Sequence, residues 1–321
     1  MSNTWAIVVV GLLVFLIILV VVSYLVEAMR SAPKIPTTLK WDPKIRIAYV
    51  DVDGVRLRYI TVGTGPTLVL LHTLRTQLDI FQKVIPELSK QFKVYALDYP
   101  GHGFSDIPKV EYKPEVFVHA VAGFLDKVDV NDAIVAGISI GGSISLILAA
   151  HQHPRVKKVI SINPYDYAKG RGIQRSSAVA NLIFSLSHVP IIGPTVMRLR
   201  NPMVEEKILE GGVAYPEALP PEFKKEMFEV GCRPGHYEAF ISVIRNASGW
   251  DDARAEYGQI KVPVLLVYGE HDWSRPDERD ANQKTIPGAE MTIVKDAGHF
   301  MSLDAPDDVV RLIKQFGGSA A

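Results

Sequence analysis

The stretch Ala136-Gly137-Ile138-Ser139-Ile140-Gly141-Gly142 closes an apolar run and begins a helical segment. A G-x-S-x-G pentapeptide between a strand and a helix predicts a sharp turn that holds the serine hydroxyl above the edge of a sheet. Gly137 and Gly141 leave room for neighbouring elements, and the positive end of the helix faces the place where an oxyanion would form. The pattern predicts that Ser139 is a nucleophile; the alternative is a serine that only caps the helix.

A serine hydroxyl is a weak nucleophile and needs a base that an acid holds in place. His299, in a glycine-containing loop after an apolar segment, is the expected base. Asp272 follows another apolar segment and is the expected acid, with Glu270 and Asp166 as the alternatives. Because the carboxyl ends of parallel strands meet at one edge of a sheet, we expect these side chains to lie close to Ser139.

Short apolar segments alternate with helical segments through most of the chain. The expected strands are 45–52, 55–62, 67–71, 94–97, 133–138, 159–162, 264–268 and 291–294, and the expected helices are 76–90, 114–128, 141–152 and 304–315. Alternating strands and helices predict an α/β fold, with a mostly parallel sheet covered by helices on both faces. Asp53-Gly54 predicts a tight hairpin turn, so the first two strands form an antiparallel edge.

The alternation stops between about residues 164 and 258. Helical segments are expected there near 176–188, 204–210, 221–230 and 236–248, with no clear strand. This pattern predicts a helical insertion between two strands of one sheet. Its apolar side chains either pack on the rest of the fold and line a pocket, or form a membrane-facing entrance. They are Ile183, Phe184, Leu186, Val189, Ile191 and Ile192.

Together these features resemble the α/β-hydrolase-fold enzymes over roughly residues 46–316. The stretch Asp98-Tyr-Pro-Gly-His-Gly-Phe-Ser105 resembles the D-x-x-G-x-G-x-S loop of that family, and the insertion resembles its helical cap. The order Ser139, Asp272, His299 is the one that the family uses. The resemblance implies an esterase- or lipase-like serine hydrolase with a covalent acyl-enzyme on Ser139, because relatives that hydrolyse epoxides carry aspartate at that position.

The segment His72-Thr-Leu74 stands where the family has an H-G-x loop. The resemblance implies that the backbone N–H groups of Leu74 and Ile140 together form the oxyanion hole. Thr73 replaces the usual glycine, and a β-branched residue restricts the backbone angles of the loop. We expect Thr73 and Arg75 to contact substrate, although Arg75 alternatively lies exposed in the first turn of a helix.

Residues 5–26 form an uncharged run in which 20 of 22 residues are apolar. At 1.5 Å per residue the run spans roughly 33 Å, enough for a bilayer core of about 30 Å. It predicts a retained transmembrane helix; a cleaved signal peptide and a buried helix are the alternatives. A signal peptide would have a basic start and a shorter apolar core. Basic residues follow the span and none precedes it, which places the catalytic domain on the cytoplasmic side.

The predicted organisation is a transmembrane helix at 5–26, a proline-containing linker at 27–44, and one hydrolase domain at 45–316. The cap is inserted at about 164–258, and residues 317–321 are expected to form a flexible tail. The 35 Lys and Arg residues balance 35 Asp and Glu residues, so the basic footprint of a nucleic-acid-binding protein is absent.

Cofactor and metal motifs are also missing from the sequence. Cys232 is the single cysteine, which excludes an intrachain disulfide and a multi-cysteine metal site. There is no phosphate loop, dinucleotide glycine pattern or metal-ligand spacing, so we expect neither a cofactor nor a metal.

The sequence thus predicts a membrane-anchored serine hydrolase that cleaves a carboxylic ester with an apolar or lipid-like substrate. The expected partners are a small apolar ester and the lipid bilayer. One alternative is a C–C bond hydrolase of a dienone-type acid, in which Arg75 would hold the carboxylate. Another is a catalytically silent binding protein of the same fold.

Overall fold

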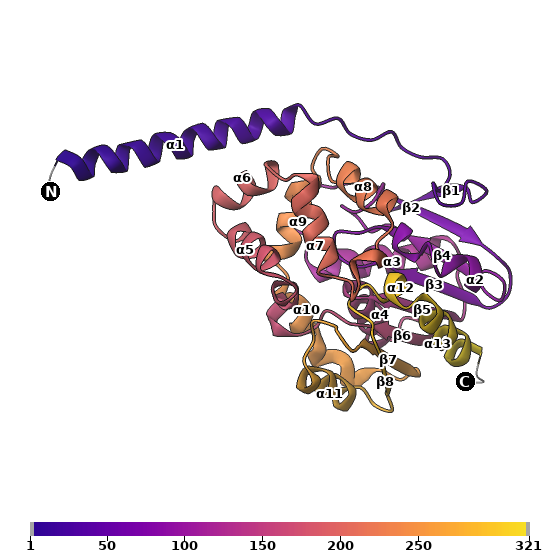
Figure 1. Cartoon of the computed structure of the whole chain (residues 1–321). Helices are drawn as coiled ribbons and strands as arrows, with labels where there is room; N and C mark the ends of the chain where they lie inside the picture. Colours follow the sequence, from indigo (N-terminus) through magenta and orange to yellow (C-terminus); the bar gives the residue numbers. More distant parts are fainter. Residues whose placement is uncertain (1–2, 319–321) are drawn as a thin grey trace.

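An eight-stranded sheet runs through the computed structural model, which describes residues 3–318 (Figure 1). Its strands are β1 (Ile47–Val52), β2 (Val55–Val62), β3 (Thr67–Leu71), β4 (Lys93–Leu97), β5 (Ala133–Ile138), β6 (Val156–Ile162), β7 (Val264–Gly269) and β8 (Glu290–Val294). Their order is β1-β2-β4-β3-β5-β6-β7-β8. The pairs β1–β2 and β2–β4 are antiparallel and the others are parallel. The predicted α/β fold with an antiparallel edge is confirmed.

Helices cover both faces of this sheet. Those outside the insertion are α2 (Ile85–Leu88), α3 (Pro114–Lys127), α4 (Ile140–Ala150), α11 (Pro276–Thr285), α12 (Met301–Asp304) and α13 (Pro306–Gly318). On one face, α4 packs against β5 and β6, and α3 packs against α4. On the other, α13 contacts α2 and approaches β5. Strand β5 is buried along its whole length, as its uninterrupted apolar sequence predicts.

The segment 76–90 does not form the single helix that its sequence predicts. It contains the 3-10 turn η1 (Leu78–Phe81) and the one-turn helix α2. The N–H of Leu78 donates to the carboxylate of Asp98 at 2.8 Å, which fixes the start of the segment to the loop after β4. Pro86 has no N–H to continue a helical ladder, so the hydrogen-bonding pattern restarts at α2.

The insertion between β6 and β7 is helical, and we call it the cap. Its helices are α5 (Ala178–Ser187), α6 (Ile192–Arg198), α7 (Pro202–Glu210), α8 (Pro221–Val230), α9 (His236–Arg245) and α10 (Ser248–Asp252). The sequence did not predict α6 or α10. Pro190 and Pro194 argue against a helix in this part of the sequence, so α6 was not expected. Pro194 lies in the first turn of α6, where a missing N–H costs little.

Helix α1 (Asn3–Ala28) precedes the domain and projects beyond it (Figure 1). Its segment Trp5–Ala28 is long and apolar enough to cross a membrane, a property that signal sequences share. The end of α1 contacts α6, so it is attached to the cap. The linker also folds back: Thr38 pairs with Arg46, and Leu39 is buried. Of the predicted tail, residues 319–321 lie outside the described residues, and α13 continues through Gly318.

Candidate active site

Ser139 occupies a sharp turn between β5 and α4. Its backbone angles are φ 59° and ψ −121°, a strained conformation for a residue with a side chain. Its N–H donates to the carbonyl of Ile162 at 2.9 Å, which ties the turn to the neighbouring strand. A Cβ added at Gly137 would lie 2.1 Å from the carbonyl oxygen of Gly141, so this turn requires glycine there. The strand–turn–helix geometry has the form of a nucleophile elbow.

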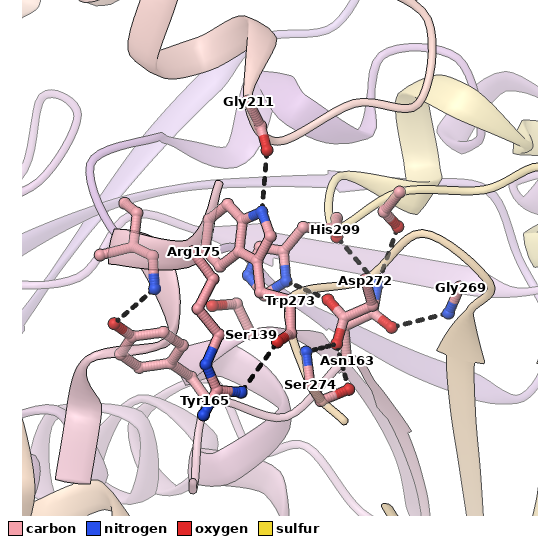
Figure 2. A network of polar contacts seen from close by, with 12 residues as sticks. Ser139, Asn163, Tyr165, Arg175, Gly211, Gly269, Asp272, Trp273, Ser274 and His299 are labelled. Atoms are coloured by element: carbon pink, nitrogen blue, oxygen red, sulfur yellow. Dashed lines mark hydrogen bonds and ion pairs between the residues drawn. The ribbon is translucent and has the colours of Figure 1, made fainter. Parts of the chain in front are cut away.

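A buried histidine–carboxylate pair lies beside this turn (Figure 2). Nδ1 of His299 is 2.5 Å from Oδ1 of Asp272, and both side chains are fully buried. The other carboxylate oxygen of Asp272 accepts hydrogen bonds from the N–H of Ser274, at 2.9 Å, and from its hydroxyl. Burial alone would raise the pKa of Asp272, but the charge of His299 and these hydrogen bonds lower it below its ordinary value. Asp272 therefore remains ionised and can hold His299 as a base.

The two other carboxylates proposed from the sequence make different contacts. Glu270 is exposed and accepts a hydrogen bond from the N–H of Asp296 at 3.1 Å. Asp166 is buried and accepts a hydrogen bond from the side-chain amide of Asn282 at 2.7 Å. Burial raises the pKa of Asp166 to about 6. Of the three candidates, the structure brings Asp272 to His299.

The ring of His299 is held by Trp273, which the sequence analysis missed. The two rings stack with centroids 3.7 Å apart and an interplanar angle of 13°. The indole N–H of Trp273 donates to the carbonyl of Gly211 in the cap at 2.8 Å (Figure 2). Nε2 of His299 is buried and has no hydrogen-bond partner within residues 3–318. Nε2 is the atom that would receive the hydroxyl proton of Ser139. The distance between a base and the hydroxyl group that it deprotonates is often long without substrate and shortens when substrate binds.

Asn163 is a second positioning residue that sequence reasoning missed. Its side-chain oxygen accepts a hydrogen bond from the N–H of Gly269 at 2.8 Å. Its side-chain amide donates to the carbonyls of Gly298 and His299, each at 3.0 Å. It thus joins the ends of β6 and β7 to the histidine loop (Figure 2). The sequence feature that could have identified Asn163 is its position as an uncharged polar residue directly after an apolar strand.

The proposed oxyanion loop lies against the elbow. A Cβ at Gly141 would be 2.2 Å from the carbonyl oxygen of Leu71, so the loop after β3 approaches α4 closely. Ile140 begins α4, and the first N–H groups of a helix have no acceptor within it. Leu74 and Thr73 line the same small cavity as Ser139. These positions are compatible with Leu74 and Ile140 as backbone donors to an oxyanion.

The strained residue of this loop is Arg75, at φ 65°, rather than Thr73. The carbonyl of Thr73 accepts hydrogen bonds from the N–H of Thr76 at 3.3 Å and from its hydroxyl at 3.0 Å. Nδ1 of His72 lies 2.8 Å from the same oxygen. These contacts fix the carbonyl of Thr73, and the positive φ of the loop falls two residues further on, at Arg75.

Arg75 bridges the loop to the cap. Its guanidinium lies 3.0 Å from Oε2 of Glu205 and 2.8 Å from Nδ1 of His236. It also lies over the ring of Phe240, 5.1 Å from the centroid. The alternative of an exposed Arg75 is therefore wrong, because its side chain is only 13% exposed. Burial, reinforced by the charge of Arg75, holds the pKa of His236 far below its usual range, so His236 is neutral.

A mostly parallel sheet with Ser139 at a strand–helix turn and a helical insertion above it defines the class of α/β hydrolases. The model of the Alpha/beta hydrolase family matches residues 68–312. The chain belongs to this family, as its resemblance implied.

Individual relatives have different printed activities. The chain is 27% identical to the 2-hydroxy-6-oxo-2,4-heptadienoate hydrolase of Pseudomonas putida, over 82% of this chain and 93% of that one. It is 26% identical to the pimeloyl-[acyl-carrier protein] methyl ester esterase of Nitrosospira multiformis, over 82% and 98%. Among solved structures, a bacterial membrane phospholipase A matches with a TM-score of 0.72 and 20% identity, over 98% of this chain and 96% of that one. This structural likeness shows the shared fold.

Proposed function

We propose that this protein is a membrane-anchored serine hydrolase that cleaves a carboxylic ester with an apolar or lipid-like acyl group. The observation that carries the proposal is the buried contact of 2.5 Å between Asp272 and His299, at the sheet edge where Ser139 occupies its strained turn. A nucleophile, a base and an orienting acid on one edge are the parts that acyl transfer requires.

The proposed reaction begins when Nε2 of His299 takes the hydroxyl proton of Ser139. The serine oxygen attacks the ester carbonyl, and the backbone N–H groups of Leu74 and Ile140 stabilise the oxyanion. When the C–O bond breaks, His299 returns the proton to the departing alcohol. A water molecule, activated by His299, then hydrolyses the acyl-enzyme. Throughout, Asp272 stabilises the charged imidazolium and holds its orientation.

Two observations support a retained anchor in place of a removed signal. The contacts between α1 and the cap are specific: Glu27 forms an ion pair with Arg200 at 2.6 Å, and Ser23 accepts a hydrogen bond from Arg198 at 2.9 Å. Cleavage of α1 as a signal peptide would remove both of these contacts with the cap, so they favour retention of the helix. In addition, the likeness to the membrane phospholipase A includes 98% of this chain, and so most of α1. The basic residues after the span favour a cytoplasmic catalytic domain.

We expect the full chain to remain in the membrane pellet after extraction with alkaline carbonate. Deleting residues 1–20 should release it to the supernatant, because this removes most of the apolar run while keeping Ser23 and Glu27 on the cap. Immunoblotting of the two fractions measures the distribution. Full-length protein in the carbonate supernatant would contradict the anchor.

The activity is tested with p-nitrophenyl esters from acetate to palmitate, using the full chain in detergent and the Ser139→Ala variant as the blank. We expect Ser139-dependent release of p-nitrophenol, with kcat/KM rising as the acyl chain lengthens, because longer chains bury more apolar surface. Absence of Ser139-dependent release from every ester would reject the proposal.

C–C bond hydrolysis is the second candidate, supported by the likeness to the Pseudomonas putida enzyme. In that reaction Arg75 would hold a substrate carboxylate, but Glu205 already compensates its charge at 3.0 Å. Esters are therefore favoured. If the chain consumes a dienone-type acid faster than any ester, measured by loss of the dienone absorbance, this candidate replaces the ester proposal.

A further inference from the structure

The cavity at Ser139 is nearly closed. Its volume is about 20 Å³, and its walls include Thr73, Leu74, Tyr165 and Trp273. Since a cavity needs about 10–15 Å³ to hold one water molecule, there is no room here for an ester. A substrate must therefore arrive from a neighbouring space.

A larger space lies next to it in the cap. This space, which we call the anchor-side cleft, has a volume of about 210 Å³ and is lined by residues of α5, α6, α7 and α9. Eight of its twelve lining residues are apolar, among them Ile183, Val196, Leu199 and Val204. An apolar cleft of this kind suits a hydrocarbon chain better than a polar ligand.

The two cavities share a wall. Arg75, Ile208, Leu209 and Phe240 line both of them, so a single layer of side chains separates the cleft from the space around Ser139. The ion pair between Arg75 and Glu205 joins the loop after β3 to α7 of the cap and so holds this wall in place. Rotation of these side chains would join the two spaces without disturbing the sheet.

The cleft also lies beside the anchor. The segment 196–200 contacts both the cleft and the anchor: Val196, Met197 and Leu199 line the cleft, Arg198 binds the end of α1, and Arg200 does both. Arg198 stacks on Tyr24 of α1, with its guanidinium 3.8 Å from the ring centroid. The segment that lines the cleft is thus attached to the end of α1, the helix that would enter the bilayer and that lies beside α6 (Figure 1).

Large apolar side chains are exposed on the same part of the cap. They belong to α5, to the turn before α6, and to the start of α7: Leu182 (59% exposed), Val189 (39%), Ile191 (61%) and Met203 (74%). Such a group of exposed side chains beside an apolar helix is suited to contact with lipid.

We infer that the anchor-side cleft receives one acyl chain of a membrane lipid directly from the bilayer. The shared wall then opens and admits the ester group to Ser139. This inference rests on the proposed function, because it names the source of the lipid-like substrate, but binding of the chain can be measured without turnover.

The test uses the full chain with Ser139→Ala in phosphatidylcholine vesicles that contain a phosphatidylcholine with a photoactivatable diazirine on one acyl chain. After irradiation, we expect lipid adducts within residues 183–209. Adding Val204→Trp, which fills the cleft, should lower the yield of these adducts about tenfold, as loss of roughly 1.4 kcal/mol of binding would. The matched control is Val110→Trp, at an exposed position that lines neither cavity, and it should not lower the yield.

Leu199→Trp fills another part of the cleft and guards against a folding defect in one variant; circular dichroism checks both. Adducts confined to α1, or equal yields with and without Val204→Trp in folded protein, would each overturn the inference. Ester hydrolysis with no adducts in the cap removes this inference alone. Adducts in the cap without any Ser139-dependent hydrolysis remove the proposed activity and leave the lipid site.

Discussion

Replacing Ser139 by alanine is expected to abolish both ester hydrolysis and labelling by a fluorophosphonate probe. The structure holds this serine at a strained turn next to the buried imidazole of His299. Three residues on the wall of the catalytic cavity carry a hydroxyl group, Thr73, Ser139 and Tyr165, and of these only Ser139 lies at a helix N-terminus. Loss of a triad nucleophile lowers kcat by about 10⁶-fold, so the remaining rate should be near the blank.

The matched control is Ser145→Ala in α4, the helix that follows Ser139. Ser145 is also fully buried, but its hydroxyl donates to the carbonyl of Gly142 at 2.6 Å, and it does not line the cavity at Ser139. This variant should still be labelled. Gel fluorescence after probe treatment and release of p-nitrophenol provide two independent measurements. Full labelling of Ser139→Ala would show that another residue is the nucleophile.

The central elements could be predicted because their signals are local. The apolar run of β5 and the glycines around Ser139 determine the elbow within one short stretch of chain. Strand β7 could be predicted for the same reason, because every one of its residues is buried and no charged or amide side chain interrupts its sequence. In both cases the neighbours in sequence are also the neighbours that determine the conformation.

The contacts that complete the site come from distant parts of the chain. Asn163 binds the carbonyl of Gly298, 135 residues away, and Arg75 pairs with Glu205, 130 residues away. A lone sequence carries no signal for such pairs, because many charged or amide side chains are equally available. The same limit explains why an exposed Arg75 stood as an alternative, although its side chain is only 13% exposed and contacts the cap.

Replacing Asp272 by asparagine should lower kcat by about 10⁴-fold while leaving the fold intact. One carboxylate oxygen of Asp272 accepts two hydrogen bonds from Ser274, and the other faces Nδ1 of His299. In the variant, the amide oxygen will turn to the two donors of Ser274, which leaves the amide NH₂ facing Nδ1. That arrangement favours the imidazole tautomer with its proton on Nε2. Such a ring cannot accept the proton of Ser139.

Asp166→Asn is the control that separates the two candidate acids. Burial raises the pKa of Asp166 to about 6, so its environment penalises the charged form, and an uncharged amide of the same shape is a mild change there. Its partner is Asn282, away from the imidazole. We expect kcat for p-nitrophenyl butyrate to stay within about threefold of wild type, the size of a small local perturbation. If Asp166→Asn instead lost the activity and Asp272→Asn kept it, the acid would be Asp166, and the short contact between Asp272 and His299 would have only a structural role.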